Sequence, residues 1–357
     1  MNKKWLRKTI QNFTPYVVPE IKEKIVINAN ESPYHILDFP KVKEDFLESL
    51  EKLSSYRYPD PLANELRAAL GEYVGVPKEQ ILATNGGDEL ISLIMNTFLN
   101  EGDTLLVHIP TFDVYASTAE ILGATVIKVP GTDDFKCDTK AFKDTVQRIQ
   151  PKISIICNPN NPTGELWSLD TIEEILKIAE NPVVVDEAYL EFANQESVIP
   201  LLQKYDNLIV IRTLSKAFGL AGYRLGYGVA TADMISVLTL TKLYYNLNSV
   251  TQLMGLVAMK HRDEILQHNV PPTIEARDYL IAQLNEIEEV TTYPSSTNFI
   301  LLKVPHAEII IEALRKADIC VRYYSSKELT NCIRITATTK NVADQILRVF
   351  REVFTHA

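Results

Sequence analysis

The sequence lacks the features that mark nucleic-acid-binding and membrane proteins. Its 36 Lys and Arg stand against 46 Asp and Glu, and the net charge of -10 disfavours non-specific binding to nucleic acid or to an anionic membrane. No apolar run reaches the length of a membrane span, and no continuous apolar segment follows the basic residues at the start. We therefore expect a cytoplasmic protein that binds neither nucleic acid nor membrane.

Cysteine and histidine are also scarce, with four and six residues among 357. The cysteines form no Cys-x-x-Cys pair, which argues against a zinc cluster or a dithiol redox site; they are Cys137, Cys157, Cys320 and Cys332. His261 and His268 lie two turns apart on an expected helix, but no carboxylate or cysteine frames them at metal-ligand spacing. The sequence therefore predicts no metal site.

What the chain does contain indicates an α/β fold. Short apolar runs rich in Val and Ile alternate with amphipathic segments between about residues 60 and 230, as in a mostly parallel sheet between helices. The runs are ILAT at 81, TLLVHI at 104, ATVIKV at 124, KISIIC at 152, PVVVDE at 182 and NLIVIR at 207. Asp138 is well placed to cap the helix that follows it.

After about residue 250 the pattern changes. Two long helical segments, 250–266 and 271–287, precede NFILLKV, a helix, ICVRYY, CIRITA and a last helix. This order predicts a smaller α+β domain. We expect an N-terminal arm over 1–30, a large domain over 31–250 and a small domain over 251–357, in keeping with the length.

Two turns at the ends of expected strands could bind a ligand. Asn85-Gly86-Gly87-Asp88-Glu89 opens a helix, where glycines and free N–H groups favour a phosphate, although a plain turn with an Asp cap would look the same. Asn158-Pro159-Asn160-Asn161-Pro162-Thr163-Gly164 forms a rigid loop at a strand's carboxyl end, where open α/β sheets bind ligands. A simple connector is the alternative reading of this loop.

A third segment carries a candidate catalytic lysine. Lys216 in TLSKAFGLAGYR follows an expected strand among small and apolar residues, which disfavour its protonated form. An amine with a lowered pKa is what Schiff-base chemistry requires, although most lysines only cover the surface. Nearby hydroxyls and Arg224 supply groups that could bind a phosphate.

The ordered set Asn161, Asp186, Tyr189, Lys216 and Arg224 resembles that of fold-type-I pyridoxal-phosphate enzymes. RTLSKAFGLAGYRLG and NPNNPTG are similar to the histidinol-phosphate aminotransferase group, and the likeness extends over NANESP, RYPDP, NGGDE, PTFDVY, DEAY and CIRIT. The implied fold is a large domain with a mostly parallel sheet between helices, plus a smaller α+β domain.

The resemblance implies a role for each residue. Lys216 would carry pyridoxal 5'-phosphate, Asp186 would hold its ring nitrogen protonated, and Tyr189 with Asn161 would bind its phenolic oxygen. Phe112 would stack on the ring, where the group often has tyrosine. The phosphate would be held by Gly87, Asp88, Thr213, Ser215 and Arg224, with Tyr58 reaching over from the other subunit of a homodimer with shared active sites. The substrate would contact Arg334, Arg322, Tyr16 and Asn161.

The implied reaction moves an amino group between histidinol phosphate and 2-oxoglutarate, with glutamate as the second amine, through a Schiff base in histidine biosynthesis. Three alternatives stay open at this point. An aromatic amino-acid aminotransferase would need only a different pocket lining. A threonine-phosphate decarboxylase resembles the group and keeps the lysine. A non-catalytic regulatory domain is disfavoured by the intact lysine–aspartate pair and the absence of a basic face.

Overall fold

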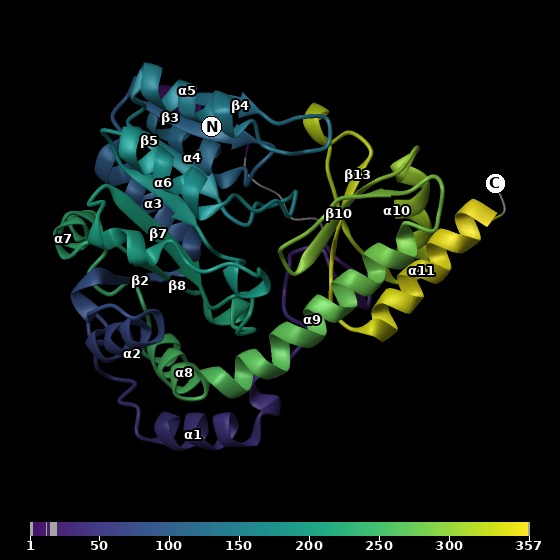
Figure 1. Ribbon diagram of the computed structural model, residues 1–357. Coiled ribbons are helices and arrows are strands. Elements are labelled where there is room, and N and C mark those ends of the chain that lie inside the picture. Colours follow the sequence, from purple (N-terminus) through teal and green to yellow (C-terminus); the bar gives the residue numbers. More distant parts are fainter. Residues whose placement is uncertain (1–2, 12, 15–19, 356–357) are drawn as a thin grey trace.

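The computed structural model describes residues 3–11, 13–14 and 20–355, and a seven-stranded sheet forms the centre of its larger part (Figure 1). The strand order is β2-β8-β7-β6-β5-β3-β4, and only β8 runs antiparallel to its neighbours. The expected mostly parallel sheet is therefore confirmed. Its strands are β2 (Ile81–Asn85), β3 (Thr104–Ile109), β4 (Thr125–Pro130), β5 (Ile153–Cys157), β6 (Val183–Asp186), β7 (Leu208–Thr213) and β8 (Leu225–Val229).

The six expected apolar runs are β2 to β7, whereas β8 was not expected. Its sequence LGYGV contains two glycines, which weaken a strand pattern. The structure shows why Gly226 is there: a Cβ on it would lie 2.6 Å from the carbonyl carbon of Gly86. The close approach of β8 to the first residues of α3 requires glycine, and this tertiary reason is invisible in a local pattern.

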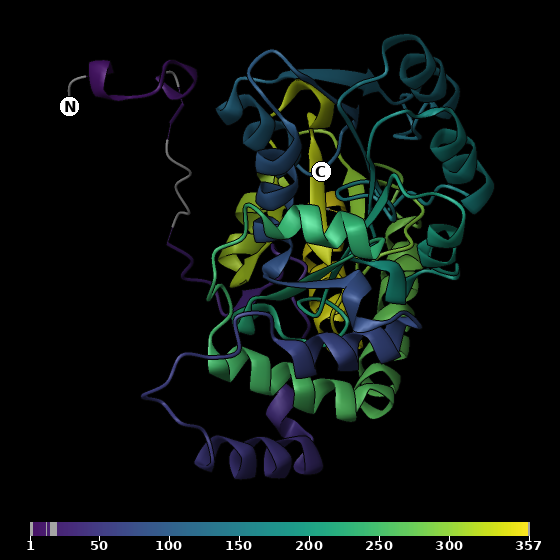
Figure 2. The same ribbon diagram turned by 90° about the vertical axis from the view of Figure 1, so that its left-hand side faces the viewer.

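Helices cover both faces of this sheet, as Figure 1 shows. Side chains alternate along β6, so Val183 and Val185 join the apolar cluster on one face and Val184 the cluster on the other. The first face packs against α1 (Pro40–Glu51), α2 (Asn64–Val74), α5 (Thr139–Ile149), α6 (Leu169–Ile178) and α8 (Ser249–Lys260). The second packs against α3 (Gly86–Phe98), α4 (Val114–Leu122) and α7 (Ala232–Thr239). Figure 2 shows α1 lying beneath α8.

The expected cap of α5 is confirmed, since the carboxylate of Asp138 accepts a 2.8 Å hydrogen bond from the Ala141 amide. Among the described residues, no helix combines the length and the apolar character that crossing a membrane would need.

A second, antiparallel sheet forms the smaller part, in the order β12-β13-β10-β9. Helices α10 (Ala307–Lys316) and α11 (Lys340–Thr355) and the end of α9 (Arg262–Leu284) contribute to the same apolar cluster as this sheet. Its strands are β9 (Thr291–Thr292), β10 (Phe299–Lys303), β12 (Arg322–Tyr323) and β13 (Cys332–Thr336), while β1 (Ile25–Val26) pairs with β11 (Ile319–Cys320). The expected α+β architecture is confirmed.

The two long helices after residue 250 differ from the expectation. The break falls at His261, and α9 continues through Pro271 and Pro272, where a second helix was expected to begin. Each proline removes an amide donor, a local cost that normally ends a helix. Here tertiary packing outweighs it, because Ile265 is buried in the large core and Leu280 in the small one. One helix therefore links both parts.

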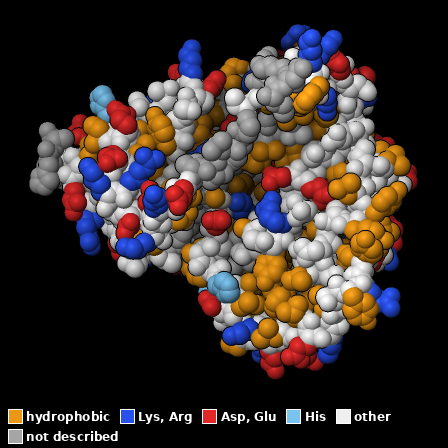
Figure 3. All heavy atoms as spheres, turned by 180° about the vertical axis from the view of Figure 1, so that it is seen from behind, with side chains coloured by type: hydrophobic (Ala, Val, Ile, Leu, Met, Phe, Trp, Pro, Cys, Tyr) orange, Lys and Arg blue, Asp and Glu red, His pale blue; other side chains and the backbone are white. Residues whose placement is uncertain are grey.

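The domain limits stay a prediction. Helix α8, which begins at Ser249 and lies almost wholly in the expected small domain, packs with α1 and α2, and α9 reaches the core of the smaller part at Leu280. Residues of the expected arm also join that core, since Ile27 is buried in it. Figure 3 shows the surface indented between the two parts, with basic and acidic side chains near the indentation.

Candidate active site

Lys216 lies just beyond the end of β7, half-buried between the two parts of the molecule. Its Nζ donates a 2.8 Å hydrogen bond to the carbonyl of Ala29 and lies 5.9 Å from the centre of the Tyr189 ring. Burial, and then the positive charge of Arg334, lower the pKa of Lys216 to about 8. A useful fraction of this amine is neutral near physiological pH, which suits a nucleophile or a base.

Asp186 ends the neighbouring strand β6 and is only 5% exposed. Its Oδ2 accepts a 2.5 Å hydrogen bond from the Tyr115 hydroxyl, and its Oδ1 accepts one of 3.0 Å from the Ala188 amide. Burial raises the pKa of Asp186 to about 6, although the Tyr115 hydrogen bond opposes the rise. A buried carboxylate of this kind is suited to a cationic partner.

Tyr115 is a site residue that the sequence analysis missed. It lies on α4 and is 1% exposed. A tyrosine on the apolar face of a helix normally indicates packing, and only its position in PTFDVY, one turn after Phe112, could have drawn attention to it.

A buried arginine joins the loop after β5 to the small domain. Nη1 of Arg334 donates a 2.6 Å hydrogen bond to Oδ1 of Asn161, and Nη2 donates one of 2.7 Å to the carbonyl of Asn28. Its Nε is buried and has no hydrogen-bond partner within the described part of the chain. Arg334 is 8% exposed, so this cation with a spare donor faces the interior beside Lys216.

Tyr189 follows Asp186 by three residues and is buried. Its hydroxyl accepts a 3.0 Å hydrogen bond from Nδ2 of Asn30, and burial raises the pKa of its phenol. The phenol therefore keeps its proton at neutral pH. Asn30 was not predicted as a site residue; its only signal was its place in NANESP.

The predicted phosphate-binding groups gather at the N-terminus of α3. Nη2 of Arg224 lies 3.1 Å from Oδ2 of Asp88, and both side chains are about half-exposed. Gly86 has a φ of +79°, which favours glycine, and a Cβ on it would lie 2.5 Å from Nη2 of Arg224 and would displace that guanidinium. Gly87 comes next, and a Cβ on it would touch Ile211 of β7. The N-terminus of α3, the Arg224 guanidinium and the backbone of the two glycines thus lie next to one another, as a phosphate-binding site requires.

Thr213 and Ser215 lie at the end of β7, next to this turn. Both are buried, and the Thr213 hydroxyl donates a 3.3 Å hydrogen bond to the carbonyl of Leu225 and accepts one of 3.1 Å from the Ser215 amide. The structure therefore brings the two hydroxyl residues to the same end of the sheet as Lys216.

The remaining predicted residues are placed less centrally. Phe112 contacts Tyr115 edge-on, with 5.5 Å between ring centres. Arg322 faces Arg334 across the β12–β13 pair, and its guanidinium lies 5.6 Å from the ring centre of Tyr324. Tyr58 is 81% exposed and stacks on Tyr245. Tyr16 lies outside the described residues.

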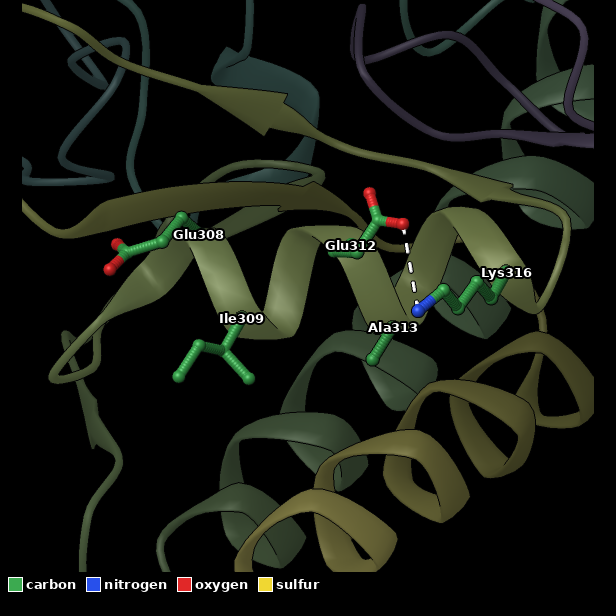
Figure 4. A pocket seen from close by; sticks show the side chains of 5 residues that line it. All are labelled: Glu308, Ile309, Glu312, Ala313 and Lys316. Atoms are coloured by element: carbon green, nitrogen blue, oxygen red, sulfur yellow. Dashed lines mark ion pairs between the residues drawn. The ribbon is translucent and has the colours of Figure 1, made fainter.

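Within the described residues, neither a metal-binding cluster nor the surface pocket on α10 offers an alternative functional site. Within residues 3–11, 13–14 and 20–355, no group of three or more His, Cys, Asp or Glu could hold a metal ion. Figure 4 shows a surface pocket whose walls come from one helix, with a 3.6 Å ion pair between Glu312 and Lys316. Its lining residues are Glu308, Ile309, Glu312, Ala313 and Lys316, and none belongs to the candidate site.

This architecture, a mostly parallel sheet covered by helices beside a smaller α+β domain, is that of the fold-type-I class of enzymes. The family model described as aminotransferase class I and II matches residues 22–350. The chain belongs to this family, and it is an aminotransferase.

Individual proteins agree with the family match. A relative from Caldanaerobacter subterraneus subsp. tengcongensis, named histidinol-phosphate aminotransferase, is 36% identical over 349 residues and covers 98% of both chains. One of the same name from Ruminiclostridium cellulolyticum is 38% identical over 94% of both chains. The crystal structure of histidinol-phosphate aminotransferase from Sinorhizobium meliloti in complex with pyridoxal-5'-phosphate covers 98% of both chains, with a TM-score of 0.88 and 24% identity.

Proposed function

We propose that the chain transfers an amino group between histidinol phosphate and 2-oxoglutarate, with pyridoxal phosphate as cofactor and Lys216 as the residue that carries it. Relatives that are named histidinol-phosphate aminotransferase, and that match over nearly their whole length, support this reaction. The observation on which the proposal chiefly depends is the environment of the Lys216 amine, which has a pKa of about 8, is close enough to buried Arg334 for its charge to lower that pKa, and lies 5.9 Å from the ring centre of Tyr189. An amine nucleophile and an anion-binding cation are thereby held in one site.

The residues present fit this cofactor. Asp186 is a buried carboxylate that would hold a protonated ring nitrogen, and burial raises its pKa, while its hydrogen-bond partners in the described chain, the Tyr115 hydroxyl and the Ala188 amide, carry no positive charge. Gly87, the α3 amides and Arg224 would hold the phosphate, since the glycine at 86 lets the Arg224 guanidinium approach the start of α3. Asp88 would contribute by orienting Arg224 through its 3.1 Å ion pair.

When bound, the cofactor supplies the electron sink that stabilises negative charge on the substrate's α-carbon. The chain's own residues do the rest. Lys216 in its neutral form takes the proton from the α-carbon and returns one as a general acid. The Ala29 carbonyl, 2.8 Å from Nζ, gives the lysine a defined resting position nearby. The Tyr189 phenol stays protonated and serves as a donor.

Two arginines on adjacent strands would bind the acidic end of the substrate. Arg334 has a spare Nε donor, and Arg322 faces it across the β12–β13 pair. Two guanidinium groups suit a phosphate dianion and also accept a carboxylate from glutamate, so one pocket would serve both substrates of a ping-pong reaction. Asn161 would hold Arg334 in place through the 2.6 Å hydrogen bond. We propose that Tyr16 closes this pocket.

A homodimer with shared active sites completes the proposal. Tyr58 projects into solvent from a surface that also exposes large apolar side chains, which a partner subunit would bury. Exposed large side chains in the neighbouring segments are Tyr56, Leu240, Leu243 and Tyr244. The location of this dimer in the cytoplasm stays a prediction from the sequence.

The experiment that tests the function is a panel of amine donors given to purified protein loaded with pyridoxal phosphate. Absorbance of the bound cofactor and the release of an oxo-acid are followed together. We expect reaction with histidinol phosphate and glutamate, and none with phenylalanine or tyrosine. Reaction with the aromatic amino acids alone would replace the proposal with an aromatic aminotransferase, and carbon dioxide released from threonine phosphate would replace it with a lyase.

A further inference from the structure

Residues Asn28, Ala29 and Asn30 form a strap that crosses the candidate site. Each of them is held by a different predicted site residue: Arg334 donates to the carbonyl of Asn28, Lys216 to that of Ala29, and the Asn30 amide group donates to the Tyr189 hydroxyl. The strap lies outside the motif segments that supply the lysine, the aspartate and the phosphate turn. The roles proposed for those segments therefore do not explain the contacts of the strap.

Asn30 is the most firmly fixed residue of the strap. It is 1% exposed and has a φ of 56°, a conformation that asparagine tolerates better than most residues. Its backbone amide donates a 3.0 Å hydrogen bond to Oγ1 of Thr336, and its carbonyl accepts one of 3.0 Å from Nδ2 of Asn298. Thr336 lies on β13 and Asn298 directly before β10, so these hydrogen bonds join the strap to the smaller sheet.

The side-chain amide of Asn30 has a defined orientation. Its Oδ1 lies 3.4 Å from the Thr336 hydroxyl, which donates to it, so Nδ2 points to Tyr189. Because the Tyr189 oxygen accepts this hydrogen bond, its single proton is directed away from Asn30 and can be donated to another acceptor.

We propose that Asn30 is a positioning residue, which orients the phenol of Tyr189 as a hydrogen-bond donor to the ring oxygen of the cofactor. Thr336 on β13 in turn holds Asn30, so the orientation of the phenol depends on this strand. The inference rests on the proposed function, because it needs pyridoxal phosphate at Lys216. A donor to the ring oxygen stabilises its anionic form and competes with the proton that the lysine–cofactor linkage would otherwise share with it. Loss of the positioned donor therefore raises the pKa of that linkage.

The test is a double-mutant cycle read by absorbance. The variants Asn30→Gly, Tyr189→Phe and the double variant are loaded with pyridoxal phosphate, and the pKa of the lysine–cofactor linkage is obtained from spectra across pH. Glycine keeps the positive φ without strain, and the charged groups around Lys216, namely Arg334, Glu31, Arg224 and Asp88, stay unchanged. We expect Asn30→Gly to raise this pKa by roughly one unit and to add nothing in the Tyr189→Phe background.

Thr336→Val tests the link to β13 and serves if Asn30→Gly does not fold. It removes the hydroxyl that holds Asn30, and a smaller rise in the same direction is expected. Thr338→Val is the matched control, since the Thr338 hydroxyl is buried and has no hydrogen-bond partner in the described chain. An unchanged pKa in Asn30→Gly, or an equal rise with and without the Tyr189 phenol, would overturn the positioning role, and an inert Thr336→Val would overturn the link to β13.

The wild-type spectrum separates this inference from the function beneath it. A wild-type protein that takes up pyridoxal phosphate at Lys216 and shows a pH-dependent absorbance band leaves the cofactor assignment standing, whatever the variants do. A wild-type protein without such a band would overturn the proposed function and the role of Asn30 with it.

Discussion

The hydroxyl of Tyr115 on α4 donates a 2.5 Å hydrogen bond to Oδ2 of Asp186 at the end of β6, and both side chains are buried. A carboxylate with one oxygen held in this way can offer the other side to a cationic partner in a fixed direction. The helix that covers the sheet thus helps to determine how the predicted cofactor ring is gripped. It also makes the proton affinity of Asp186 depend on a residue that the sequence analysis did not assign to the site.

Replacing Tyr115 by phenylalanine removes this hydrogen bond and leaves the ring in place. We expect the unfolding free energy to fall by about 1–3 kcal/mol, because a buried acceptor loses its partner. Pyridoxal phosphate affinity should fall roughly tenfold as the carboxylate loses its fixed direction. Urea unfolding of the cofactor-free protein and absorbance titration with the cofactor measure the two effects. Tyr205→Phe, which removes a 2.9 Å hydrogen bond to surface Glu173, is the control. Unchanged cofactor affinity in Tyr115→Phe would count against the orienting role.

The raised pKa of Asp186 predicts how the cofactor-free protein responds to pH. The folded state holds this proton up to about pH 6, whereas an unfolded aspartic acid releases it near 3.8. The folded state therefore binds more protons between these values, and stability falls as pH rises through them, by roughly 3 kcal/mol in total. Asp186→Asn has no carboxyl group at this position and therefore lacks this loss of stability. In urea titrations, its unfolding free energy relative to that of the wild type should rise from pH 4 to pH 6.5. Curves that stay parallel over this range would refute the raised pKa of Asp186.

Local patterns were sufficient to predict most of the large sheet. The six apolar runs became β2 to β7 because buried parallel strands need unbroken Val and Ile, a demand that is visible in a few residues. Strand β8 and the unbroken α9 were not predicted. Gly226 is required in β8 because the backbone of Gly86 lies close to it. The local cost of the two prolines in α9 is outweighed by the packing of both ends of this helix. Such causes lie in residues far apart along the chain.

The candidate site divides in the same way. Lys216, Asp186 and Arg224 could be predicted as candidates because each lies in a short motif beside a strand end. Tyr115 and Asn30 were missed because they act through another residue over separations of 71 and 159 positions. Nothing in their neighbours distinguishes a tyrosine that holds a carboxylate from one that only packs. Only the folded chain reveals these supporting contacts.

The turn proposed to bind the phosphate predicts a contrast between two glycines. Gly86 and Gly75 both have positive φ, near 79° and 75°, so alanine should cost each about 1 kcal/mol of stability. Only at Gly86 would the new methyl group meet Nη2 of Arg224, whereas nothing lies within 4 Å at Gly75. We expect Gly86→Ala alone to weaken pyridoxal phosphate binding, by at least tenfold, in an absorbance titration. Equal affinities in the two variants would show that Arg224 does not hold the phosphate.

The pKa of Lys216 predicts the rate at which cofactor-free protein captures pyridoxal phosphate. Only the neutral amine attacks an aldehyde, so the second-order rate constant should rise as pH increases and level off above about pH 8, near the pKa that burial and Arg334 give this lysine. For a lysine with an ordinary pKa, the rate constant would still be rising at pH 10. Stopped-flow absorbance from pH 6 to pH 10 measures the profile, with Lys140→Ala, at an exposed ion pair with Asp144, as the control.

Arg334→Met should move the midpoint of this profile to higher pH, because it removes the nearby positive charge that disfavours protonated Lys216. Burial of the amine remains in this variant, so the midpoint should stay below that of an exposed lysine. A profile that keeps rising to pH 10 in the wild type would mean that the amine is as basic as a surface lysine. Lys216 would then lack the property that suits it to carry the cofactor.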